Sequence, residues 1–168
     1  MTLTSAAALA NVLNFVMFAM IAVWYVAPWL TGRPRAEALT TLLWVHAFRD
    51  IALQIFSAQK FGFAVSNETR DVIVGGDLLG MTLAVTSIIA LRYRASMAPL
   101  VIWAFVAETA FDLVYTSILG VREQLYESAS ALTFLIVAFY VPLLWVTLGL
   151  VMWQLYVRRH EPLALARA

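Results

Sequence analysis

The chain has 168 residues, of which 63% are hydrophobic and only 12% are charged, and its mean hydropathy is +0.86. Soluble domains carry about 25% charged residues, so the excess of apolar residues predicts lipid contact and an all-α integral membrane protein. The chain contains no cysteine, which excludes disulfides and thiolate metal sites. A net charge of +1 gives no basis for nucleic-acid binding. With two histidines and no phosphate-binding glycine loop, we expect neither a metal site nor a cofactor.

Apolar runs separated by short polar turns predict a five-helix transmembrane bundle in a single domain, residues 1–168. The expected helices are residues 6–30, 38–58, 71–91, 98–120 and 130–156. The first run has neither a basic leading region nor a small-residue cleavage site, so we expect it to remain as a helix. The last run exceeds the length of about 20 residues that a span requires, which predicts tilt or protrusion.

Basic residues are divided unevenly between the two ends of this predicted bundle. The turns and tail at the C-terminal end contain Arg33, Arg35, Arg92, Arg94, Arg158, Arg159 and Arg167. The opposite end contains Lys60, Arg70 and Arg122. The positive-inside rule therefore predicts a cytoplasmic C-terminus and an outside N-terminus. Frequent arginine beside a single lysine is typical of a GC-rich bacterial genome, so we expect the bacterial inner membrane.

The second predicted helix carries an unusual polar stretch, Trp44–Gln54. If it is a continuous helix, His46, Asp50 and Gln54 recur every four residues on one side, and Arg49 lies close to that side. Lipid is a poor neighbour for such a face. We therefore expect other helices to cover it.

Polar side chains of other predicted helices reach a similar depth, at a rise of about 1.5 Å per residue. Asp77, Glu108 and Asp112 fall between the midplane and the outer face of the membrane, with Asn14 and Tyr115 near them. Deep aromatic residues of the last helix, Tyr140 and Trp145, are candidates to line a cavity. His46, Asn14 and the aromatic residues also have a purely structural interpretation, as interhelical hydrogen bonds and packing.

The charge balance of this polar layer predicts protonation. A charged side chain at a helix centre costs about 2.5–3.5 kcal/mol on insertion scales. Arg49 neutralises one carboxylate, whereas Asp50, Asp77, Glu108 and Asp112 together contribute four. Because desolvation and like charges disfavour the ionised form, we expect at least one carboxyl to be protonated near neutral pH.

Several of these residues occur in a pattern that resembles the EXPERA group, which includes the emopamil-binding sterol isomerase and the sigma-two receptor. His46-xxx-Asp50 resembles the His-xxx-Glu of the isomerase, and Asp77 resembles its acid in the following helix. The segments 111–115 and 140–145 resemble two further stretches of the group. The resemblance covers roughly residues 40–157 and implies an apolar ligand, a lateral entrance from lipid, and acids that act on a double bond.

Three functions are compatible with these observations. The first is a membrane-embedded site or enzyme for a sterol, terpenoid or lipid, an isomerase or cyclase that acts by acid–base catalysis. Its candidate catalytic residues are Asp50, Asp77, Asp112, His46 and Glu108, and its candidate ligand-binding residues are Arg49, Gln54, Asn14, Tyr115, Tyr140 and Trp145. The second is a proton- or cation-coupled transporter or channel, which the lack of an internal repeat and of polar residues in the inner halves of the helices disfavours. The third is a structural membrane subunit. Whether copies of the chain form a homo-oligomer stays open.

Overall fold

The computed structural model describes residues 2–129 and 131–163, and within them the regular structure is entirely helical. Ser130, the expected first residue of the last helix, and Arg167 of the expected cytoplasmic tail lie outside the described residues. Four described helices are long and apolar enough to span a membrane. They are Thr4–Thr31, Asn67–Arg92, Ala98–Arg122 and Leu132–Val157. These helices correspond to four of the five expected spans.

The first apolar run forms one long rod. It consists of α1 (Leu3–Ile21), the π-helical turn η1 (Ala22–Val26) and α2 (Ala27–Thr31). The Thr2 hydroxyl caps the start by accepting a hydrogen bond from the backbone N–H of Ser5. The wider π turn lies just before Pro28, which cannot donate a helical hydrogen bond.

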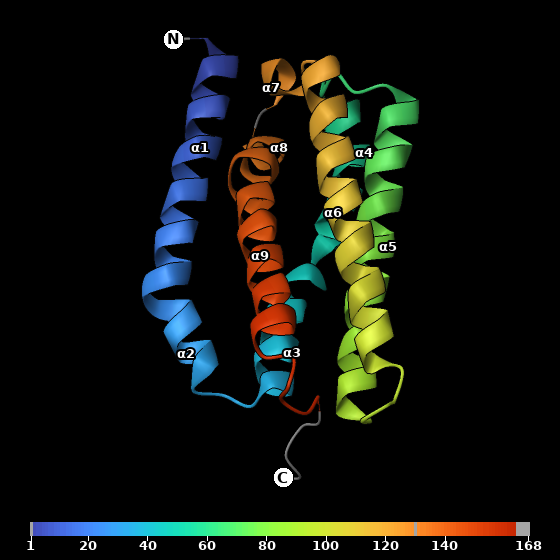
Figure 1. Cartoon of the computed structure of the whole chain (residues 1–168). Helices are drawn as coiled ribbons and strands as arrows, with labels where there is room; N and C mark the ends of the chain where they lie inside the picture. Colours follow the sequence, from blue (N-terminus) through green and yellow to red (C-terminus); the bar gives the residue numbers. More distant parts are fainter. Residues whose placement is uncertain (1, 130, 164–168) are drawn as a thin grey trace.

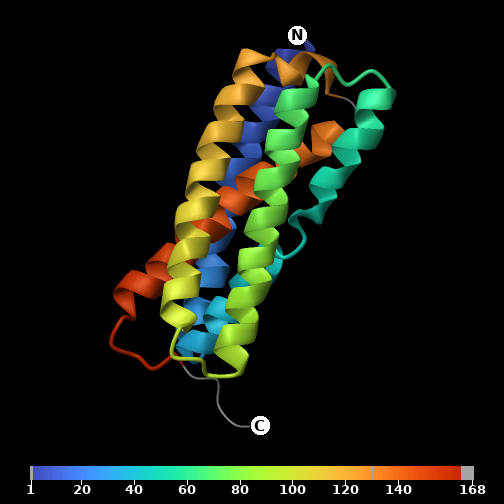
Figure 2. The same cartoon turned by 90° about the vertical axis from the view of Figure 1, so that its right-hand side faces the viewer.

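The second apolar run differs from the prediction of one helix over residues 38–58. The chain forms α3 (Arg35–His46), turns at Ala47 and Phe48, and continues as the 3₁₀-helix η2 (Arg49–Leu53) and then α4 (Gln54–Lys60). None of these pieces reaches the length of a membrane span. Figure 2 shows the broken segment on one side of the bundle.

Two long, continuous helices follow the broken segment. The Ser66 hydroxyl caps α5 (Asn67–Arg92) by accepting from the backbone N–H of Thr69 at 3.1 Å. α6 (Ala98–Arg122) begins with Pro99 in its first turn, where a missing N–H costs nothing. α5 and α6 pack against each other along their lengths, more extensively than any other described pair.

The last part of the chain turns back and runs down the bundle. It comprises α7 (Leu125–Ser128), α8 (Ala131–Leu135), the π-helical η3 (Ile136–Tyr140) and α9 (Val141–Val157). Pro142 follows η3 and lacks an N–H, so backbone carbonyls one turn earlier lose their helical donor. The amides of Asn11 and Asn14 supply donors, at 2.8 Å to the carbonyl oxygens of Val137 and Ala138 respectively.

The helices form a bundle in which the two ends of the described chain lie at opposite ends (Figure 1). α1 packs on η3 and α9, and α3 packs on both α5 and α9. The larger apolar cluster fills the C-terminal half, with Leu39, Leu43, Phe105, Leu148 and Val151 at most 2% exposed. A smaller apolar cluster closes the opposite half around residues 52–74 and 125–129.

Candidate functional site

Arg49 lies at the centre of a polar cluster between η2, α5 and α6. Its side chain is 0% exposed, although it belongs to a mainly apolar bundle. Nε donates to Asp77 Oδ1 at 2.7 Å, Nη1 donates to Thr109 Oγ1 at 3.1 Å, and Nη2 donates to Asp112 Oδ2. Glu108 Oε2 lies 3.9 Å from Nη1. The guanidinium thus holds acids from two neighbouring helices in one place.

The cluster contains more acid than base. One guanidinium faces the carboxyl groups of Asp77, Glu108 and Asp112. Thr109 bridges the cluster, because its hydroxyl accepts from Arg49 and donates to Glu108 Oε2 at 3.1 Å. If all three carboxyls are ionised, two negative charges stay uncompensated within it. This local balance supports the expectation that at least one of them carries a proton.

Two glycines of α5 make room for this cluster. A Cβ added to Gly76 would overlap the Asp112 carboxyl group. A Cβ added to Gly80 would lie 2.8 Å from Arg49 Cζ and 2.9 Å from Glu108 Oε2. Gly76 and Gly80 are four residues apart, a spacing of small residues that is typical of close helix contacts. Here the space beside them is filled by charged side chains between the helices.

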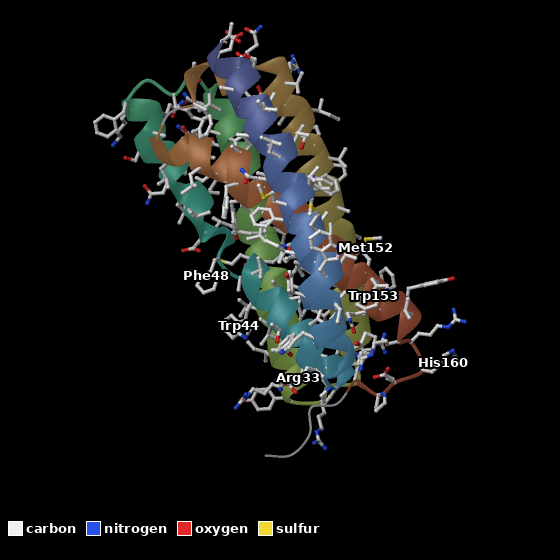
Figure 3. All side chains as sticks on the ribbon, turned by 90° about the vertical axis from the view of Figure 1, so that its left-hand side faces the viewer. Arg33, Trp44, Phe48, Met152, Trp153 and His160 are labelled. Atoms are coloured by element: carbon white, nitrogen blue, oxygen red, sulfur yellow. The ribbon has the colours of Figure 1, made fainter. Side chains whose placement is uncertain are left out.

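The break after α3 places Arg49 in the cluster. The turn removes the backbone hydrogen bond that the carbonyl of Val45 would receive in a continuous helix, and the Tyr140 hydroxyl donates to it instead at 2.9 Å. Phe48 is 65% exposed beside the break, and Figure 3 shows it pointing out from the bundle near Trp44. The side chain of Arg49 lies on the inner side, between the two acids.

A cavity of about 100 Å³ begins at the cluster and extends toward the N-terminal end of the bundle. Its walls are Ile51, Ile55, Phe63, Ile73, Asp77, Asp112, Leu113, Thr116, Ser117, Gly120, Leu125, Tyr126, Thr133, Ile136, Val137, Tyr140, Val141 and Leu144. Along α6 these residues run from Asp112 to Gly120, which is about 12 Å at 1.5 Å per residue. The cavity wall is therefore mostly apolar along its length and acidic at its inner end.

Two predicted site residues of the second apolar run lie outside the cavity. Asp50 is exposed and makes no hydrogen bond or ion pair with any described residue. Gln54 is exposed and lines a separate groove of about 280 Å³ between α4 and α8. The break rotates both residues away from Arg49, so the predicted face of His46, Asp50 and Gln54 does not form.

His46 is completely buried but lies against α9 and α6 instead of an acid. Its Nε2 is 3.0 Å from Thr147 Oγ1, and its ring meets Phe105 edge-on at 5.0 Å between centroids. The Thr147 hydroxyl also lies 2.8 Å from the Leu143 carbonyl, and a proton on Nε2 of His46 lets the hydroxyl donate to that carbonyl while it accepts from His46. His46 Nδ1 then has no hydrogen-bond partner among the described residues.

The remaining predicted ligand residues separate into one that lines the cavity and three that do not. Tyr140 is part of the wall. Asn14 binds a backbone carbonyl of η3, Tyr115 stacks on Phe111 at 5.7 Å on the outer surface, and Trp145 packs against the larger apolar cluster. Asn14 and Trp145 thus have the structural roles that the sequence analysis allowed for them.

Three polar residues that the fold buries are not among the site residues predicted from the sequence. Thr109 directly follows Glu108 and carries no signal of its own. Gln154 is 0% exposed, and its Oε1 accepts from Arg158 Nη1 at 3.0 Å. Arg35 is nearly buried and donates to the backbone carbonyls of Gln154, Leu155 and Glu161. The expectation that the inner halves of the helices lack polar residues was therefore wrong at the end of α9.

Comparison with known protein families gives a match over most of the chain. Residues 6–156 match the family model described as Domain of unknown function (DUF8737). Comparison with curated proteins gives no match, and comparison with solved structures gives none either. The match covers α5 and α6 completely, all but the terminal residues of the first and last long helices, and every residue of the Arg49 cluster. The chain therefore belongs to the DUF8737 family.

Proposed function

We propose that the protein binds an apolar small molecule within the membrane and acts on it by proton transfer, as an isomerase or cyclase would. The observation that carries the proposal is the position of Asp77 and Asp112. Both carboxyl groups line the apolar cavity, and both are held by Arg49. Intramembrane acids that face a cavity mark functional sites by default.

The cluster is suited to acid–base chemistry on an uncharged hydrocarbon. A protonated carboxyl donates a proton to a double bond, and a nearby carboxylate removes a proton from another carbon, so the number of protons is conserved. Asp77 and Asp112 are our candidates for these two roles. Arg49 stabilises whichever of them is ionised, and Thr109 positions Glu108 beside it.

The size of the cavity narrows the ligand class. An engineered cavity of about 150 Å³ accommodates benzene, so a cavity of about 100 Å³ accepts only a small apolar group. This size favours one isoprene unit of a longer isoprenoid, or one segment of a lipid chain, with the remainder of the molecule outside the cavity, over the fused rings of a sterol. A whole sterol would enter only if the cavity walls moved apart.

The membrane arrangement is part of the proposal. We count the broken α3–η2–α4 segment as a fifth span beside the four long apolar helices. The basic residues favour a cytoplasmic C-terminus and an outside N-terminus. We place the protein in a bacterial inner membrane on this basis, with the cavity in the outer half.

Two of the alternative predictions receive less support. Transport requires access from both faces, whereas Leu39, Leu43, Leu148 and Val151 seal the C-terminal half below the cluster. The relationship to the EXPERA group stays a prediction. Two of the residues on which the resemblance depends, His46 and Asp50, do not line the cavity.

The test uses the full-length protein in detergent micelles with geraniol as a small isoprenoid probe and cholesterol as a large one. We expect geraniol to raise the melting temperature and cholesterol to leave it unchanged. We expect Asp77→Asn and Asp112→Asn each to raise, at least tenfold, the geraniol concentration that is needed to shift the melting temperature. Asp50→Asn should leave this concentration unchanged. Deuterium from D₂O that appears on a carbon atom of the recovered geraniol would report proton transfer, because the hydroxyl proton exchanges without the protein.

Distinct results contradict the proposal. Proton flux into proteoliposomes that depends on Asp77 and Asp112, without a geraniol shift, would favour the transporter. A protein in which none of these substitutions changes probe binding, deuterium incorporation or flux would be a structural subunit.

A further inference from the structure

Two loops line the end of the cavity that lies away from Arg49. The loop of residues 61–66 connects α4 to α5, and the segment of residues 123–129 connects α6 to α8. Phe63 of the first loop lines the cavity, and so do Leu125 and Tyr126 of the second. Both loops lie at the N-terminal end of the bundle (Figure 1).

Apolar contacts hold the inner surfaces of these loops on the cavity. Phe63, Val65 and Leu125 are each about 5–6% exposed and belong to the same apolar cluster as Ile55 and Val74. Burial of apolar area at about 25 cal/mol per Å² favours the closed position. Opening therefore has to expose this cluster.

Polar ties join the outer surfaces of the same loops. Glu123 accepts from the Ser66 backbone N–H at 2.9 Å, from the Ser66 hydroxyl at 2.7 Å, and from the Thr69 hydroxyl. The Ser128 hydroxyl accepts from the Ala64 backbone N–H at 3.0 Å. These ties depend on few side chains, and Glu123 contributes to most of them.

Each loop also contains a residue in the left-handed region. Gly62 has φ of 96° at the end of α4, and Gln124 has φ of 52° directly after Glu123. These residues reverse the chain sharply, so each loop folds over the bundle as a compact unit.

We propose that residues 61–66 and 123–129 form a lid over the cavity, that Glu123 latches it closed, and that the ligand reaches the acids when the lid opens. For its ligand this inference rests on the proposed function. The lid itself is a property of the two loops. Its opening can therefore be measured without any ligand.

The test introduces Thr116→Cys as a reporter in the cavity wall of a chain that has no other cysteine. A small, charged, membrane-impermeant thiol reagent is added to the protein in proteoliposomes. We expect Glu123→Ala to accelerate labelling of the reporter about tenfold, because hydrogen bonds to a charged acceptor are lost and a tenfold change corresponds to about 1.4 kcal/mol. Glu127→Ala, which removes an equal charge from the same segment, should leave the rate unchanged.

A second arm locks the lid. Ala64→Cys with Ser128→Cys replaces the tie between the loops with a disulfide, in a chain without the Thr116→Cys reporter. We expect oxidation to slow the association of geraniol and reduction to restore it. Equal association rates before and after oxidation would overturn the lid as the route of access.

The outcomes separate the two proposals. Accelerated labelling without geraniol binding supports the lid and removes the proposed ligand class. Geraniol binding with labelling that Glu123→Ala does not change overturns the lid. If a membrane-permeant thiol reagent also labels all variants equally fast, access runs from the lipid, through the groove that shares Phe63 and Thr133 with the cavity.

Discussion

Arg49 is the residue on which the polar cluster depends. Burying a guanidinium costs several kcal/mol, and the cost is offset only because each side of its planar group meets an acceptor. The surrounding acids depend on it in turn. Asp77 and Asp112 belong to different helices, and Arg49 is the cation that binds both.

Removal of this cation should destabilise the folded protein. We expect Arg49→Met to lower the free energy of unfolding by about 3–5 kcal/mol, because buried carboxyl groups lose their partner. Thermal unfolding in detergent measures the change. Arg92→Met, at an exposed arginine, should change stability by no more than about 0.5 kcal/mol.

A compensating variant tests the physical reason. Asp77→Asn together with Asp112→Asn should restore part of the stability lost in Arg49→Met, since the uncompensated charges are then absent. No recovery would show that Arg49 stabilises the bundle through packing of its side chain instead of charge.

At the scale of the helices, α5 is shaped by the cluster that it faces. Gly75, Gly76 and Gly80 look alike in the sequence, yet only Gly76 and Gly80 face Asp112 and Arg49. The spacing of four residues between Gly76 and Gly80 is typical of a close contact between helices. The contact proves to be with charged side chains, which the spacing alone does not reveal.

These glycines provide a matched series for mutation. Gly76→Ala and Gly80→Ala should destabilise the protein, because the new methyl group displaces the Asp112 carboxyl or the Arg49 guanidinium. Gly75→Ala meets no atom within 4 Å and should stabilise by up to about 1 kcal/mol through helix propensity. Unfolding of the three variants by chemical denaturant compares them, and equal effects at all three positions would contradict this account.

The broken segment shows where prediction from local sequence ends. Residues 38–58 contain neither proline nor glycine, so no local signal predicts a break. The break becomes favourable because Arg49 then reaches acids on α5 and α6, while Tyr140 satisfies the freed Val45 carbonyl. These partners lie far away in the sequence, at separations of 28 to 95 residues.

For the whole molecule, the sealed C-terminal half and the loop-covered N-terminal half make the bundle asymmetric. Glu123 contributes to the cover by joining segments 54 and 57 residues apart. The Ser66 backbone N–H and the Thr69 and Ser66 hydroxyls lower the pKa of Glu123 below its usual value of 4.5. The tie is therefore fully present above pH 4.5 and is lost as the pH falls through the lowered value.

Because these hydrogen bonds need the ionised form of Glu123, the effect of removing its side chain on thermal stability should depend on pH. The melting temperature of Glu123→Ala should lie slightly below that of the unsubstituted protein at neutral pH, because a partly exposed carboxylate contributes little to stability. The two melting temperatures should converge in acid, where Glu123 is protonated. Glu127→Ala provides the control in a pH series of thermal unfolding curves. A difference that persists unchanged into acid would show that the Glu123 charge does not act through these hydrogen bonds.

The sequence by itself determined the helical class, the four long apolar helices and the acids that meet in the bundle, because hydrophobicity, helix length and charge inside apolar runs are local properties. Asp77, Glu108 and Asp112 were found in this way. Only the tertiary structure decided that Arg49 binds both Asp77 and Asp112 and that Asp50 and Gln54 lie apart from them. The physical reason is that the backbone rotates at Phe48, and contacts with distant helices stabilise this rotation.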